Sequence, residues 1–200
     1  MREKILQVSL SLFAKDGYEG VSVSDISEKL NITKGALYRH FQGKRDIYDA
    51  ILTRVEEHVR PMPADFGLPR GPLTDANREE YRRADPSALK LYAMAAFRHW
   101  TENEFARSFR QLLVMEQFHD ERAAGLMSVE FVSGILGYLG DLLGEMSALT
   151  SVPAQGDLLA LEFYAPLHML MGFLGATIHG EKLASLASRH VDAFFDRWLR

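Results

Sequence analysis

The sequence predicts an all-α protein, in which a small N-terminal unit of three helices precedes a larger helical domain. Apolar residues recur at spacings of three and four along almost the whole chain, and the sustained alternation that a half-buried strand needs is missing. Helix is discouraged mainly at residues 61–73, which hold four prolines and two glycines. This segment separates the N-terminal helices from the rest of the chain.

The first helix is indicated by three apolar residues on one face, Leu6, Leu10 and Phe13. Gly17 follows where a left-handed C-terminal cap belongs. Ser22 and Asp25 have the S-x-x-D pattern of a capping box, which predicts the start of a second short helix.

The turn into the third helix is predicted at Asn31, a residue type that accepts positive φ, and at Thr33, a good N-cap. The third helix is expected from Lys34 to Phe41, with Leu37 facing inward. A fourth helix is expected from Lys44 to about residue 59, with an inward face of Ile47, Ile51 and Val55.

In the larger domain the helical pattern returns in five stretches, at about 86–101, 103–117, 120–147, 156–178 and 181–199. Four glycines of the third stretch fall on one side, where they allow close helix packing or leave room for a ligand: Gly134, Gly137, Gly140 and Gly144. The pattern leaves open whether residues 61–85 form an ordered lid or a flexible linker.

The net charge of −4 is unevenly distributed. Residues 1–60 hold ten Lys and Arg against nine Asp and Glu, and residues 61–200 hold 13 against 18. A mildly basic N-terminal part favours a focused contact with nucleic acid over non-specific coating. The chain has no cysteine, which excludes disulfides, thiolate metal sites and a cysteine nucleophile.

The sequence contains no motif of an enzyme, a metal site or a bound cofactor. The histidines His99, His119, His168 and His179 form no H-x-x-x-H or H-E-x-x-H pair, and neither G-x-S-x-G nor a Gly-rich phosphate loop occurs. The N-terminus leads into an amphipathic stretch without the apolar core of a signal peptide, so we expect a cytoplasmic protein. The uncharged run 163–180 is interpreted as a buried helix, and no membrane partner is expected.

Two short helices joined by a three-residue turn are typical of a helix-turn-helix, whose second helix enters the major groove of DNA. The small Ala36 can touch a thymine methyl, and Arg39 can donate hydrogen bonds to O6 and N7 of guanine. Lys34, Tyr38, His40 and Lys44 are better placed for phosphates. The alternative interpretation of these residues is the solvated polar face of a small helical subdomain.

A longer set of residues at fixed spacing favours the first interpretation. The chain resembles the DNA-binding domain of the TetR (tetracycline repressor) family of bacterial transcriptional regulators at Phe13-Ala14-x-x-Gly17-Tyr18, Ser22-Val23-x-Asp25-Ile26, Leu30-x-Ile32-Thr33-Lys34-Gly35-x-Leu37-Tyr38-x-His40-Phe41 and Lys44. The resemblance covers about residues 1–48 and implies an N-terminal helix-turn-helix DNA-binding domain. The positions that it implies at DNA are Ser22, Ser24, Thr33, Lys34, Gly35, Ala36, Tyr38, Arg39, His40 and Lys44.

Two positions depart from the family pattern. The family commonly has glycine where this chain has Asn31, and a long basic or polar residue where this chain has Ser24. Asn31 can still form the turn, whereas the short Ser24 puts one phosphate contact in doubt.

The resemblance also implies that residues 49–200 form a helical effector-binding and dimerisation domain, connected through helix 44–60, and that the last two long helices form a homodimer. Independently, the final helix carries a broad apolar stripe, and the helix before it is apolar nearly all round. The predicted dimer interface consists of Leu183, Leu186, Val191, Phe194, Phe195 and Trp198. The alternative is a monomer in which both faces pack internally.

Large soft side chains of the same domain predict a pocket between helices for a small apolar or aromatic effector. Its expected lining is Tyr92, Phe97, Trp100, Phe109, Met115, Phe118, Tyr164 and His168. Each of these side chains also fits ordinary core packing.

The sequence therefore predicts a ligand-responsive transcriptional regulator, expected to be a repressor, that binds a palindromic double-stranded operator as a homodimer. A small-molecule effector is expected to release the DNA by shifting the helix of residues 44–59, taken as the only covalent link between the pocket and the DNA-binding helices. The alternative is an interaction protein that keeps this fold without sequence-specific DNA binding.

Overall fold

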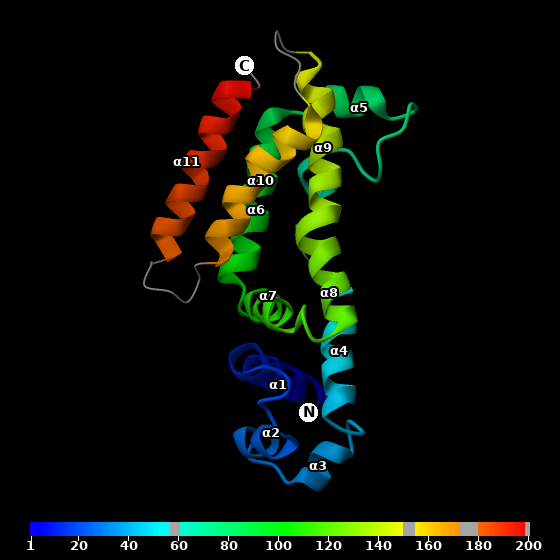
Figure 1. The fold of residues 1–200 in the computed structure, drawn as a ribbon, viewed down its shortest axis with the longest axis vertical. Helices are drawn as coiled ribbons and strands as arrows, with labels where there is room; N and C mark the ends of the chain where they lie inside the picture. Colours follow the sequence, from blue (N-terminus) through cyan, green and yellow to red (C-terminus); the bar gives the residue numbers. More distant parts are fainter. Residues whose placement is uncertain (57–60, 150–154, 173–179, 199–200) are drawn as a thin grey trace. The chain divides into compact units, whose positions relative to one another are not determined.

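The computed structural model describes residues 1–56, 61–149, 155–172 and 180–198. Within these ranges every regular element is a helix, which confirms the predicted all-α class (Figure 1). The chain forms two compact units: Met1–Val59 with Asn103–Met127, and Arg60–Glu102 with Ser128–Arg200. Because the chain crosses between these units three times, the helix of residues 44–59 is not their only connection.

The first unit contains the predicted helix-turn-helix. Its helices are α1 (Arg2–Asp16), α2 (Val23–Lys29), α3 (Lys34–Tyr38), α4 (Lys44–Glu56), α7 (Glu104–Glu116) and α8 (Glu121–Ser128), the last as far as Met127. α1 packs against α2, α4 and α7. The predicted inward residues Leu6, Leu10, Phe13 and Leu37 are all buried, whereas the side chain of Val55 lies outside the described residues.

Side-chain caps and residues with positive φ form the turns of this unit at the predicted positions. The Asp25 amide donates to Ser22 Oγ (3.2 Å) and the Ser22 amide donates to Asp25 Oδ2 (2.7 Å), which completes the capping box. Asn31 has a φ of 53°, and Thr33 Oγ1 accepts a hydrogen bond from the Ala36 amide (3.1 Å). Gly17 has the expected positive φ of 76°, but its ψ of 162° is extended and not left-handed helical.

The third helix is shorter than predicted, because α3 ends at Tyr38 instead of Phe41. The amides of His40 and Phe41 both donate to the carbonyl oxygen of Leu37, which closes the helix with a tighter last turn. Gln42 and Gly43 then lead directly into α4, as the sequence predicts.

The second unit is built around α9 and α10. Its described elements are η1 (Pro63–Phe66), α5 (Arg78–Arg82), α6 (Pro86–Glu102), the π-helical turn η2 (Val129–Ser133), α9 (Gly134–Ser147), α10 (Gly156–Gly172) and α11 (Gly180–Trp198). α9 packs against α5 and α10, and α6 packs against α10 and α11 (Figure 1). The predicted extension of α10 through residues 173–178 lies outside the described residues.

The segment 61–85, whose state the sequence left open, is ordered against this unit. η1 packs on α6, α5 packs on α9, and Leu68 and Tyr81 are buried. The Tyr81 hydroxyl donates to the carbonyl oxygen of Gly71 (2.5 Å), which fixes the loop between these two short helices.

One helical stretch, Glu121–Ser147, is long and apolar enough to resemble a membrane span by composition. Core helices of water-soluble proteins meet the same criterion. Leu139, Leu142, Leu143 and Met146 of this stretch are buried in the core of the second unit.

Candidate functional site

The helix-turn-helix presents most of the predicted DNA-contacting residues to solvent. Leu37 is completely buried, whereas Lys34 and Arg39 on the same short segment are exposed and Tyr38 is 51% exposed. Of the ten predicted residues, seven are exposed and three are half-buried: Ser22, Thr33, Lys34, Gly35, Tyr38, Arg39 and His40 in the first group, Ser24, Ala36 and Lys44 in the second. α3 is therefore anchored on one side and free to contact a partner on the other.

The charges of Lys34 and Arg39 remain available for such a partner. Neither side chain forms an ion pair with a residue in the described ranges. A cation that pairs with no carboxylate in the folded chain loses no internal partner when it binds a phosphate or a guanine.

Lys44 differs from the other predicted contacts because its ammonium group lies against its own unit. Lys44 Nζ donates to the carbonyl oxygen of Tyr18 (2.8 Å) and lies 4.1 Å from the centroid of the Tyr18 ring. Glu19 Oε2 is 3.8 Å away. Lys44 thus ties the start of α4 to the loop between α1 and α2, a contact that sequence spacing does not reveal.

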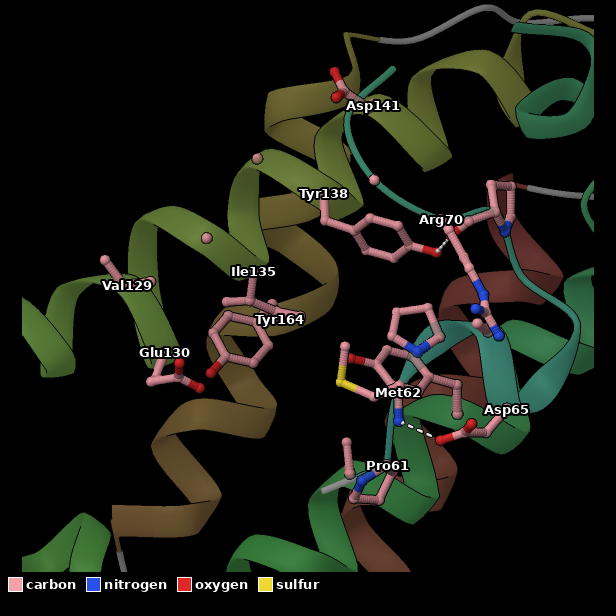
Figure 2. A pocket seen from close by; sticks show the side chains of 18 of the residues that line it. Pro61, Met62, Asp65, Arg70, Val129, Glu130, Ile135, Tyr138, Asp141 and Tyr164 are labelled. Atoms are coloured by element: carbon pink, nitrogen blue, oxygen red, sulfur yellow. Dashed lines mark hydrogen bonds between the residues drawn. The ribbon is translucent and has the colours of Figure 1, made fainter. Parts of the chain in front are cut away.

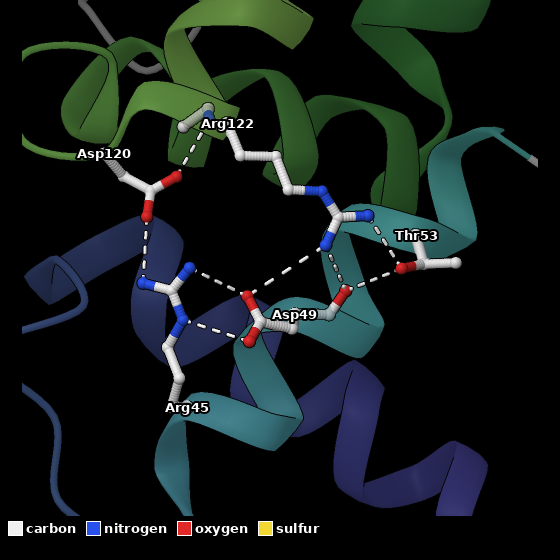
Figure 3. A network of polar contacts seen from close by, with 6 residues as sticks. Arg45, Asp49, Thr53, Asp120 and Arg122 are labelled. Carbon is white, nitrogen blue, oxygen red and sulfur yellow. Dashed lines mark hydrogen bonds and ion pairs between the residues drawn. The ribbon is translucent and has the colours of Figure 1, made fainter.

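A polar network joins α4 to the start of α8 within the same unit (Figure 3). The Arg45 guanidinium binds Asp49 (2.9 Å) on α4 and Asp120 (2.9 Å), and Arg122 donates to Thr53 Oγ1 (2.7 Å). Burial acts to raise the pKa of Asp120, but hydrogen bonds from the Ala123 amide and from Arg45 outweigh it and lower the pKa. Asp120 therefore stays ionised and holds α4 in place. Sequence analysis missed this network, because 75 residues separate Arg45 from Asp120.

The second unit contains a cavity of about 840 Å³, a size that suits a small molecule. Three of the eight predicted lining residues border it: Tyr92, Trp100 and Tyr164. Residues 61–65 and 69–72 line it as well, so the proline-rich segment forms part of the cavity wall.

The other five predicted lining residues lie elsewhere, which corrects the sequence prediction. Phe97 is 1% exposed in the core of the second unit, and His168 does not border the cavity, although its Nδ1 is 3.4 Å from Tyr164 Oη. Phe109, Met115 and Phe118 belong to the first unit: Phe109 is 0% exposed and Phe118 is 82% exposed. Helical periodicity shows that a residue is apolar and on one face, but not which unit that face joins.

Sequence analysis missed the polar residues of the cavity. Glu130 reaches the cavity from the π-helical turn η2, a kind of turn that often occurs at functional sites. Arg70, Tyr138 and Asp141 also border the cavity (Figure 2). Tyr138 Oη donates to the carbonyl oxygen of Pro69 (3.2 Å), and burial raises the pKa of Tyr138, which keeps its hydroxyl protonated.

The sequence left open whether the glycine stripe of the 120–147 segment allows close helix packing or leaves room for a ligand. In the structure, two of its glycines border the cavity and two allow close packing. Gly134 and Gly137 border the cavity. Gly140 and Gly144 lie against the start of α10, where a Cβ on Gly144 would be 3.3 Å from Gly156 Cα. The stripe was the sequence signal that could have located the cavity wall.

The predicted dimer interface needs a correction too. Leu183, Val191, Phe194 and Phe195 are at most 4% exposed within the core of their own chain, so they cannot present a face to a partner. Leu186 is 37% exposed and Trp198 is half-buried. The apolar stripe of α11 faces inward because α6 and α10 cover it.

Comparison with known proteins identifies the N-terminal segment. Residues 5–51 match the family described as bacterial regulatory proteins, tetR family. The chain is 41% identical over 49 residues to the biofilm operon icaADBC HTH-type negative transcriptional regulator IcaR of Staphylococcus aureus, and 42% identical over 48 residues to IcaR of Staphylococcus epidermidis. Each match spans 24% of this chain and about a quarter (26%) of the relative.

Solved structures resemble the whole chain in fold. The SmeT–triclosan complex has a TM-score of 0.63 at 18% identity, over 100% of this chain and 91% of that one. A protein from Saccharomonospora viridis in complex with choline has a TM-score of 0.64 at 16% identity, over 98% and 95% of the two chains. The TetR family transcriptional regulator PfmR from Thermus thermophilus has a TM-score of 0.59 at 19% identity, over 98% and 99%. Residues 5–51 therefore form a domain of the tetR family of bacterial regulatory proteins.

Proposed function

We propose that this protein is a cytoplasmic transcriptional repressor that binds a palindromic operator as a homodimer and releases it when a small molecule occupies the cavity of the second unit. The observation that carries the proposal is the arrangement of α3, with Leu37 buried and Lys34, Tyr38 and Arg39 exposed. The name of IcaR as a negative transcriptional regulator supports repression over activation.

Selection of bound sequences from random duplex DNA, with the purified protein and no added ligand, tests this proposal. Enrichment of a palindrome is expected, because a twofold dimer presents two recognition helices to two half-sites. The alternative, an interaction protein that only keeps the fold, predicts no enrichment from the folded dimer. A steep loss of binding with rising salt would show that contacts with DNA phosphates contribute to the affinity.

Arg39→Ala is expected to weaken operator binding by about 1–3 kcal/mol and to relax the base preference at one position of each half-site. Lys34→Ala is expected to weaken binding to all sequences alike and to reduce the salt slope by about one. Titrations of labelled operator and of single-base variants at several salt concentrations measure both effects.

Arg107→Ala is the matched control, because Arg107 is an exposed arginine of the same unit that lies on α7, away from the recognition segment. It should leave affinity and base preference unchanged. If Arg39→Ala kept the full base preference, its role as the base-reading residue would be wrong.

The homodimer is proposed to form through α10 instead of the predicted stripe on α11. Leu158, Leu161 and Met169 of α10 are between 51% and 58% exposed, and their spacing puts them along one helix face with Ala165 between them. Three large exposed apolar side chains in one row are unusual for a monomer and favour contact with a second copy.

Leu161→Arg is expected to raise the dimer dissociation constant by at least about tenfold, because it places an unpaired charge in an apolar interface. Sedimentation velocity over a dilution series measures the effect. Leu91→Arg is the control, since Leu91 is 64% exposed on α6. Equal association of the Leu161→Arg variant and the unmodified chain would exclude this face.

The effector part of the proposal is supported by the cavity and by the neighbours of similar fold that hold triclosan and choline. A ligand changes operator affinity only if it binds one arrangement of the protein better than the other. The network of Arg45, Asp49, Asp120 and Arg122 ties α4 to the start of α8, so we propose that these helices respond together.

A further inference from the structure

A cation outside the helix-turn-helix lies against the segment that follows α3. Arg2 is the first residue of α1, and its guanidinium carbon is 4.8 Å from the centroid of the Phe41 ring. Both residues belong to the first unit, where the Arg2 side chain is exposed and Phe41 is 2% exposed. The buried ring therefore supports a guanidinium group that faces solvent.

Phe41 places this guanidinium near the end of α3. The Phe41 amide donates to the carbonyl oxygen of Leu37 (3.2 Å), which fixes Phe41 relative to the last turn of α3. Figure 1 shows the start of the chain near the segment between α3 and α4, in keeping with this contact. A guanidinium that lies on an aromatic face is held in orientation, while the N–H groups at its edge stay available to a ligand.

The charge of Arg2 has no anionic partner in the part of the chain that the structure describes. No ion pair or side-chain hydrogen bond joins Arg2 to another described residue. The acid next to it, Glu3, is paired with Arg54 of α4 instead. A cation in the first turn of a helix is unfavourable for the helix dipole, so the charge of Arg2 does not stabilise α1. It is therefore available to an external anion.

We propose that Arg2 is a further DNA contact of this protein, which donates to a phosphate of the operator backbone, and that Phe41 positions it. A phosphate accepts the paired N–H groups of a guanidinium well. The backbone is the target because Arg2 belongs to α1, whereas α3 occupies the groove. This inference rests on the proposed operator binding and extends the interface beyond residues 22–44, the span of the positions that the family resemblance implies.

Arg2→Gln is expected to weaken operator binding about fivefold and to lower the slope of log affinity against log salt by about one, because one phosphate contact is lost. The base preference should not change. Titrations of labelled operator and of single-base variants at several salt concentrations measure these effects. Glutamine is as good a helix former as arginine, and circular dichroism checks that the variant is folded.

Lys4→Gln is the matched control, because it removes the same charge from the same end of α1. Lys4 is exposed like Arg2, but a step of two residues along a helix turns the side chain by about 200°. The control should keep the affinity and the salt slope of the unmodified chain. An equal loss in the two variants would show that any cation of α1 attracts the duplex, and would overturn the assignment to Arg2.

Methylphosphonate substitutions in the operator locate the phosphate. Each substitution replaces one charged phosphate by a neutral group, so it weakens binding where the protein contacts the backbone. The unmodified chain and Lys4→Gln should lose affinity at one position of each half-site at which Arg2→Gln loses none. If the profile of Arg2→Gln equalled that of the unmodified chain, the proposal would be wrong, whatever the overall affinity.

The positioning role of Phe41 is tested by a double-mutant cycle. In Phe41→Leu the buried site stays apolar but the ring is lost, so Arg2→Gln should then weaken operator binding by less than about twofold. Circular dichroism checks the fold of Phe41→Leu, and the tests of the Arg2 contact stand without this variant. An equal effect of Arg2→Gln in both backgrounds would exclude the role of Phe41.

The two proposals can fail separately. A folded chain that enriches no sequence from random duplex DNA would refute the proposed operator binding. A chain that binds its operator with the same salt slope and the same methylphosphonate profile with and without Arg2 would keep its proposed function and refute this contact alone.

Discussion

Phe109→Ala is expected to destabilise the first unit by about 3–5 kcal/mol, whereas Phe118→Ala should change its stability by less than about 0.5 kcal/mol. Phe109 is completely buried on α7, which packs against α1, and its ring stacks on Phe105 at a centroid distance of 6.4 Å. Removing it leaves a cavity in the core that supports the helix-turn-helix. Phe118 is 82% exposed, so its removal takes little apolar surface out of the core.

The unfolding of the first unit can be measured separately from that of the second unit. Both tryptophans, Trp100 and Trp198, lie in the second unit, so tryptophan fluorescence follows that unit while far-UV circular dichroism follows both. In urea titrations of Phe109→Ala, part of the circular dichroism signal should be lost at lower urea and the fluorescence transition should remain in place. An equal loss of stability in Phe109→Ala and Phe118→Ala would contradict the exposure of Phe118. Such a result would show that another chain covers that side chain.

Gly156→Ala is expected to destabilise the second unit by about 1–3 kcal/mol. A Cβ on Gly156 would lie 2.1 Å from the Gly140 carbonyl oxygen and 3.0 Å from Gly144 Cα. Both are backbone atoms, which cannot rotate away as a flexible side chain would. The start of α10 would have to move away from α9, and the packing of Leu139, Leu142 and Phe163 would loosen with it.

Gly137→Ala is the matched control, and we expect it to increase the stability of the second unit instead of decreasing it. Gly137 lies on α9, has no positive φ, and has no atom within 4 Å of the position of an added Cβ. Alanine there should stabilise the helix by about 0.5–1 kcal/mol. The fluorescence transition in urea reports both variants, because both residues are in the same unit as the tryptophans. Unchanged stability of Gly156→Ala would mean that the α9–α10 contact is looser than these distances indicate.

The helix-turn-helix was predictable from the sequence because its determinants are local. The capping box of Ser22 and Asp25, the positive φ of Asn31 and the N-cap Thr33 each involve residues at most three positions apart. The outward face of α3 follows from the same short spacing, once Leu37 is assigned to the core. Residue types at fixed short distances therefore suffice for this part of the candidate site.

The other features of the fold and of the candidate site depend on contacts between residues far apart in the sequence. The apolar stripe of α11 is compatible with a dimer interface and with a core position. Only the packing of α6 and α10 against α11 shows that the stripe belongs to the core. Phe109 and Trp100 have the same apolar character, yet they belong to different units. The network of Arg45 and Asp120 and the carboxylates of the cavity follow no local pattern.

The sequence by itself determined the all-α class, the helix-turn-helix and the residues that it exposes, because these follow from turn chemistry and helical periodicity. The tertiary structure decided which unit α7 joins, where the cavity lies, and that residues 61–65 and 69–72 line it. The reason is physical: an amphipathic helix encodes one apolar face, but the partner for that face is chosen by long-range packing among several faces of similar hydrophobicity.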